Sequence, residues 1–120
     1  MSETPNPKHY DLEARTLLFL KDVIKLCKQL KKDTINIEIV KQLIRSAGSV
    51  GANYREANES ISKKDLNLRI RISRKEAKES HFWLQALLEA NAGFQKDITP
   101  LIQESLELAR IFTAIMNKTR

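Results

Sequence analysis

The sequence is poor in the residues that build disulfides and metal sites. Its 120 residues include one cysteine, Cys27, and two histidines, His9 and His81. A single cysteine cannot form an internal disulfide, and neither histidine has a second histidine or cysteine at the spacing of a zinc site. His81 also lacks the Glu-x-x-His spacing of di-iron helical bundles. We therefore predict no metal and no cofactor, and we interpret Cys27 as a reduced core residue because it lies in an apolar periodic run.

Long apolar segments and known catalytic loops are also missing. No apolar run approaches the roughly 20 residues that cross a bilayer, and the N-terminal segment lacks the basic and apolar regions of a secretory signal. Neither a GxSxG elbow nor a GxxxxGK[ST] or GxGxxG phosphate loop occurs. These absences predict a cytoplasmic protein that is neither a membrane protein nor an enzyme.

Glycine and proline number only three each, while Ala, Leu, Ile, Lys, Glu and Arg dominate. This composition favours helix over sheet, so we predict an all-α protein. Residues 1–9 hold two of the prolines and little that could pack, and we expect them to form a flexible N-terminal arm. Residues 10–120 have the length of one domain.

Apolar residues recur at helical spacing in four segments. A first helix is expected from Asp11 to about Leu30, followed by a second with Asn36 as its N-cap and Ala57 near its end. Short connections between amphipathic helices favour an antiparallel up-down-up-down four-helix bundle.

The last two helices are expected from their start and stop signals. Ser62 can act as the N-cap of a third helix, which is the longest and continues to about Asn91. Gly93 is expected in the left-handed conformation that often follows a helix, with Thr99 and Pro100 as the N-cap and first residue of the fourth helix.

Small residues crowd the stretch IRSAGSVGANYREANE, at residues 44–59. Apolar spacing continues on both sides of Gly48 and Gly51, so these glycines are expected inside the second helix, where each costs about 1 kcal/mol relative to alanine. A close approach by a neighbouring helix would offset that cost. We predict such close packing at both glycines, with Tyr54 or Trp83 filling the space beside them.

The third expected helix is apolar on more than one face. Besides its core face, it carries a second apolar stripe that a lone bundle would leave in water, which favours self-association. Arg69 and Glu76 lie between these faces, and Asp65 precedes Arg69 by four residues. Asp65 and Arg69 would form a half-buried intrahelical ion pair, or the charges would form a solvated surface. The residues predicted for the oligomer interface are Leu68, Ile72, Phe82 and Ala86.

Opposite the core, the same helix carries a row of cations. The whole chain has a formal net charge of +6 and a pI near 9.6, which permits a polyanionic partner. Cations at helical spacing can meet successive phosphates, although a charged run can also be a plain solvated face. The aromatic residues look like core residues, so no platform for stacking unpaired bases is apparent. The predicted nucleic-acid-binding residues are Lys63, Lys64, Arg71, Arg74, Lys75 and Lys78.

Three segments in order, KDVIKLCKQL, IRSAGSVGANYREAN and SKKDLNLRIRISRKEAKESHFWLQALLEAN, resemble the 23S rRNA intervening-sequence protein family. The accessory variability determinant of diversity-generating retroelements is similar to that family. The family's SIGANYREA motif falls on residues 49–57, and its KEARE segment falls on residues 75–79, followed by Phe82 and Trp83, with Lys78 where Arg is frequent. The resemblance implies a four-helix bundle that assembles into a homopentameric ring with a basic surface. For the retroelement relative it also implies nucleic acid and a reverse transcriptase as partners.

These observations lead to two main hypotheses. The first is a non-enzymatic, oligomeric protein that binds RNA or DNA through phosphate contacts with little reading of base sequence. The second is a protein-interaction adaptor or scaffold, for example for a reverse transcriptase, without direct nucleic-acid binding. A small enzyme is a third possibility, for which no residue is nominated.

Overall fold

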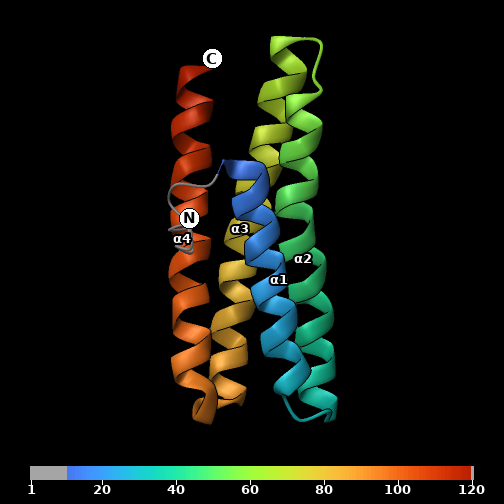
Figure 1. The fold of residues 1–120 in the computed structure, drawn as a ribbon, viewed down its shortest axis with the longest axis vertical. Helices are drawn as coiled ribbons and strands as arrows, with labels where there is room; N and C mark the ends of the chain where they lie inside the picture. Colours follow the sequence, from blue (N-terminus) through green and yellow to red (C-terminus); the bar gives the residue numbers. More distant parts are fainter. Residues whose placement is uncertain (1–10, 120) are drawn as a thin grey trace, which may run out of the picture.

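Four long helices run side by side in alternating directions (Figure 1). This computed structural model describes residues 11–119, so the expected arm at residues 1–9 lies outside the described residues. The helices are α1 (Leu12–Gln29), α2 (Thr34–Asn58), α3 (Lys63–Ala90) and α4 (Gln95–Lys118), and a short 3-10 turn, η2 (Ala92–Phe94), precedes α4. No strand occurs between residues 11 and 119. The predicted antiparallel four-helix bundle is confirmed.

Polar side chains cap the N-termini of α1 and α3. A carboxylate oxygen of Asp11 accepts a hydrogen bond from the backbone amide of Ala14 at 2.9 Å, and the Ser62 hydroxyl accepts one from the amide of Asp65 at 3.0 Å. Each bond satisfies one of the amides that a first helical turn leaves without an intrahelical partner. The prediction of Ser62 as an N-cap is confirmed.

The predicted N-cap of the second helix is wrong by three residues. Asp33, not Asn36, caps α2, because its carboxylate accepts the amide hydrogen of Asn36 at 2.8 Å. The Asn36 side chain is buried and has a tertiary role: its amide group donates to the carbonyl of Lys31 at 2.9 Å and to the side-chain oxygen of Asn91 at 3.0 Å. Asn91 donates back to Asn36 at 2.8 Å, so the pair joins the first turn of α2 to the end of α3.

The predicted start of the fourth helix is also wrong. Gly93 has no positive φ and lies in the 3-10 turn, and α4 begins at Gln95 rather than at Thr99. Pro100 therefore lies inside α4 rather than at its first position. Ile98 is fully buried, so the earlier start brings this side chain into the core. That burial favours helix across a proline whose fixed φ is compatible with it.

The core is one apolar cluster along the bundle axis. α3 packs against both α2 and α4, while α1 packs mainly against α2 and touches α4 over a smaller area. Leucine, isoleucine, valine and phenylalanine side chains supply most of the buried volume, as in other close-packed helical cores. The largest fully buried apolar side chains are Phe19, Val23, Leu43, Val50, Ile70, Leu84, Leu87, Ile98, Leu108 and Phe112.

Small side chains bring α2 and α3 together. The hydroxyl oxygens of Ser46 and Ser80 lie 2.9 Å apart in the buried interior, and the Ser73 hydroxyl donates to the carbonyl of Val50 at 2.9 Å. Buried hydroxyls with hydrogen-bond partners avoid the cost of an unsatisfied polar group.

The two glycines of α2 have different surroundings. A side chain at Gly51 would meet Thr16 of α1, whose Oγ1 atom lies 2.9 Å from the position of the missing Cβ. Close packing at Gly51 is therefore confirmed, but the partner is α1. Gly48 has no atom within 4 Å of that position, so the prediction for Gly48 is wrong. The three atoms nearest the missing Cβ of Gly51 all belong to Thr16, and none lies near that of Gly48, so neither Trp83 nor Tyr54 occupies these positions.

Candidate nucleic-acid interface

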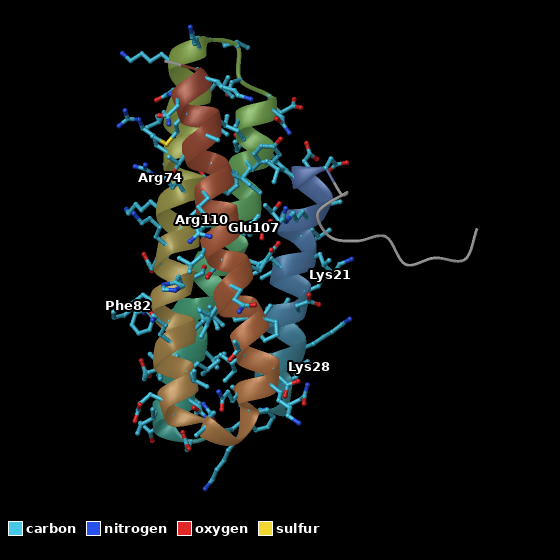
Figure 2. All side chains as sticks on the ribbon, turned by 90° about the vertical axis from the view of Figure 1, so that its left-hand side faces the viewer. Lys21, Lys28, Arg74, Phe82, Glu107 and Arg110 are labelled. Carbon is cyan, nitrogen blue, oxygen red and sulfur yellow. The ribbon has the colours of Figure 1, made fainter. Side chains whose placement is uncertain are left out.

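The solvent-facing side of α3 carries the cations that the sequence singles out. We call Lys63, Lys64, Arg71, Arg74, Lys75 and Lys78 the α3 cationic row; all are exposed except the half-buried Arg74. The row is on one continuous helix of 28 residues, so its spacing is fixed by helical geometry. Figure 2 shows Arg74 projecting on one side of the bundle, whereas Lys21 and Lys28 of α1 project on the opposite side.

The α3 cationic row has no acidic partners among residues 11–119. None of its members forms an ion pair there, and Arg71 donates only to the side-chain oxygen of Asn67, at 2.9 Å. Asn67 in turn donates to the Thr119 hydroxyl at 3.0 Å, which ties this part of the row to the end of α4. The positive charge of the row is therefore not neutralised within the described chain and is available to an external anion.

Three other charged side chains of α3 contact α2. Arg45 forms ion pairs with Glu76, at 3.3 Å, and with Glu79. The two carboxylates, with Glu79 as the larger cause, raise the pKa of the Arg45 guanidinium. Glu76 is buried, with 8% of its surface exposed, so its charge needs this partner. Arg69 donates to the side-chain oxygen of Asn53 at 3.2 Å. The expected ion pair between Asp65 and Arg69 is thus wrong: it does not occur among the ion pairs of residues 11–119, and Arg69 contacts the adjacent helix instead.

The second apolar stripe of α3 is only partly exposed. Leu68 has 52% and Phe82 has 59% of its surface exposed, while Ile72 and Ala86 are half-buried. Leu68 and Phe82 are separated by almost four helical turns, and Lys75 lies on the same side between them. The prediction that aromatic residues are core residues is wrong for Phe82, which Figure 2 shows projecting from α3 on the same side of the bundle as Arg74.

An apolar surface that the sequence analysis missed lies between α1 and α2. It forms a groove of about 370 Å³ that we call the α1–α2 groove. A second hollow lined by Leu17, Leu20, Gly48 and Gly51 continues it along the same two helices. The groove is lined by the apolar residues Ile24, Cys27, Leu30, Ile37, Val40 and Ile44, and by Lys28, Lys31, Lys32 and Lys41. The signal in the sequence was the excess of apolar positions in both helices over those that one core face can take.

Cys27 lies in this groove rather than in the centre of the core, and it is half-buried. Burial raises the pKa of its thiol to about 11, because the charged thiolate is disfavoured away from water. The thiol is therefore protonated at neutral pH, which agrees with the interpretation of an unreactive, reduced cysteine.

A buried arginine links α1 to α4 and was also missed. Arg15 has 5% of its surface exposed, and its Nε and Nη2 atoms donate to the two carboxylate oxygens of Glu104, each at 2.8 Å. Nη2 also lies 2.9 Å from Glu107. These contacts, above all the hydrogen bonds to Glu104, raise the pKa of the Arg15 guanidinium and so stabilise its charged form. The only signal was a lone arginine in the apolar run of the first helix.

Metal-binding clusters and membrane-spanning helices are both missing from the described residues. Between residues 11 and 119, no group of three or more His, Cys, Asp or Glu side chains is placed to hold a metal ion. None of the helices in this range is both long and apolar enough to cross a bilayer.

Comparisons with known proteins agree with the fold. The model of the family described as 23S rRNA-intervening sequence protein matches residues 8–114. A crystal structure of a protein of unknown function, from the S23 ribosomal protein family of Bacteroides thetaiotaomicron, is similar to this chain with a TM-score of 0.79 and 27% sequence identity. The similarity covers 88% of this chain and 98% of that one. None of the curated proteins matches the chain.

Proposed function

The chain belongs to the family of 23S rRNA-intervening sequence proteins, and from this premise we propose that it is a non-enzymatic, oligomeric protein that binds RNA or DNA through the α3 cationic row. The observation that carries the proposal is the lack of acidic partners for that row within residues 11–119. By contrast, Arg15 and Arg45 are both neutralised by glutamates of neighbouring helices.

Contacts from this row would be mainly to phosphates. Lysine binds phosphate as a point charge, and arginine can bind it with two parallel hydrogen bonds. Such contacts fix the position of a nucleic acid without reading its sequence, and they release counterions. Binding should therefore weaken steeply with salt and depend little on base sequence.

Charge reversal on α3 tests this proposal. Replacement of Lys64, Arg71 and Lys75 by Glu should abolish electrophoretic retardation of a structured RNA at about 50 mM salt, because phosphate contacts dominate binding. The matched control replaces Lys21, Lys25 and Lys28 of α1 by Glu. It changes the net charge equally, but Figure 2 shows two of its three positions, Lys21 and Lys28, on the opposite side of the bundle.

The control variant should bind RNA far better than the α3 variant. Equal loss of binding in both variants would indicate a diffuse charge effect and would contradict a localised site. No retardation of RNA or DNA by the unmodified protein at low salt would reject nucleic-acid binding altogether.

The α1–α2 groove supports the oligomeric part of the proposal, and a second candidate function, a protein-interaction adaptor or scaffold, would use the same groove for a different protein. The groove exposes 39% of Ile24 and 46% of Ile37 on a surface that continues along both helices. Apolar surface of this kind is typical of protein contacts. A second copy of the chain is the partner we propose for the groove, and a different protein, such as a polymerase, would make the chain an adaptor. The polymerase in question would be a reverse transcriptase, the partner that the retroelement relative implies.

A further inference from the structure

Phe82 lies one helical turn beyond the end of the α3 cationic row, on the same side of the helix. The residues Arg71, Lys75, Lys78 and Phe82 follow one another at intervals of four, three and four, so they form a single stripe along the helix. Phe82 is the most exposed aromatic side chain in the described residues, with 59% of its surface exposed. Packing of the bundle core explains neither this exposed aromatic ring nor the row of unpaired cations that leads to it.

The Phe82 ring is held in place by neighbouring side chains. Its plane lies at 84° to that of Trp83, with 5.0 Å between ring centroids, and this edge contact covers at most one face of the Phe82 ring. The indole nitrogen of Trp83 donates to Glu79 at 3.3 Å, and Arg45 of α2 bonds the same carboxylate. The support for Phe82 therefore reaches the neighbouring helix, which limits the ordering that a ligand would have to impose.

Aromatic rings beside cations recognise unpaired nucleotides. Cations follow the phosphates, and bases stack on the ring face with little dependence on sequence. A base within a duplex already stacks on its neighbours and cannot reach such a ring. We propose that Phe82 is a stacking platform for an unpaired base, so that α3 binds single-stranded or looped segments in preference to duplex. This inference rests on the proposed nucleic-acid binding.

Fluorescence anisotropy with a labelled oligouridylate of about 12 nucleotides, and with a duplex of the same length, tests the platform. The variant Phe82→Leu keeps an apolar side chain but removes the ring. It should weaken binding of the single strand by about fivefold or more and leave duplex binding unchanged, because loss of one base stack costs about 1–3 kcal/mol. Phe82→Trp should retain binding. Leu68→Ala, the matched control at another exposed apolar residue of α3, should have no effect.

Two further measurements separate stacking from phosphate contact. Trp83 is the only tryptophan of the chain, so its fluorescence should change when the single strand binds and should not change with the duplex. Affinity falls with salt, and Lys75→Gln should make this fall less steep, reducing the magnitude of the slope of log affinity against log salt by about 0.7. Phe82→Leu should leave the slope unchanged.

The outcomes distinguish this inference from the proposed function. If single strand and duplex bind equally and Phe82→Leu changes neither, the platform is rejected while the phosphate contacts stand. If no nucleic acid binds, both proposals fail. If Phe82→Leu changes the mass of the assembly in light scattering, Phe82 belongs to a contact between subunits and the platform is rejected.

Discussion

Arginine side chains of this protein differ in what lies beside them. Arg15 and Arg45 contact glutamates on neighbouring helices, whereas Arg71 and Arg74 have no carboxylate partner within residues 11–119. The first pair acts inside the fold by joining helices. The second pair presents charge to the outside, which is why we assign phosphate contact to α3.

Gly51 offers a test of packing at a single residue. Gly51→Ala should destabilise the protein by about 1–3 kcal/mol, because the new Cβ would lie 2.9 Å from Thr16 Oγ1, a side chain that also donates to the carbonyl of Leu12 at 2.7 Å. Gly48→Ala is the matched control in the same helix. It should be neutral or stabilising by up to about 1 kcal/mol, since nothing lies within 4 Å. Urea denaturation measures both, and equal effects would contradict the assignment.

The roles of these residues could be predicted only in part. Helical spacing placed the cations on one face of α3, but it could not show which charges are paired. The partners of Arg45 and Arg15 lie 31 and 89 residues away in sequence, so only the tertiary structure brings them together. For the same reason the sequence located the close packing at Gly51 but not its partner, Thr16.

At the scale of helices, local signals and tertiary contacts compete at each end. Ser62 caps α3 as its sequence pattern predicts, because the connection before it is exposed and makes few other contacts. Asn36 and Pro100 mislead, since burial of Asn36 against Asn91 and of Ile98 in the core outweighs their usual local preferences. Local sequence patterns therefore predict which segments are helical, whereas tertiary packing determines the residue at which α2 and α4 begin.

The attachment of α1 depends on Arg15. Arg15→Met should destabilise the protein by roughly 2–3 kcal/mol, less than the 3–5 kcal/mol typical of fully buried pairs, because Glu104 and Glu107 remain partly exposed. Hydrogen exchange should show the loss of protection first in α1. The matched control is Arg55→Met, whose pair with Glu13 spans 3.8 Å between exposed side chains and should contribute less than about 1 kcal/mol. Similar losses in both variants would show that Arg15 is not a special attachment.

At the scale of the whole molecule, the bundle follows from its periodicity, while its external surfaces do not. Four amphipathic helices with short connections leave few alternatives to an antiparallel bundle. Helical spacing in a single sequence does not distinguish apolar residues that remain exposed to water from those that contact a second molecule. The sequence therefore singled out the α3 stripe with Ile72 and missed the groove at Ile24 and Ile37.

Self-association should depend on that groove. We expect light scattering at micromolar concentration to give a multiple of the 13.8 kDa chain mass, with a pentamer as the form implied by the family resemblance. Ile24→Asp and Ile37→Asp should each dissociate the assembly, because a charge would enter an apolar contact. Ile72→Asp, on α3, is the comparison and should leave the mass unchanged. A monomeric unmodified protein would reject self-association, and dissociation by Ile72→Asp alone would move the contact to α3.

The serine contacts between α2 and α3 also set the register of the two helices. Ser46 faces Ser80 at 2.9 Å, and a slip of one turn would bring Leu84 or Glu76, both much larger, to the position opposite Ser46. Because two serine side chains in direct contact leave no room for a larger one, sliding is opposed by steric overlap, in addition to the ion pairs of Arg45 with Glu76 and Glu79. The steric contact is uncharged, so it should keep the α3 cationic row in the same position relative to α2 even where salt weakens those ion pairs.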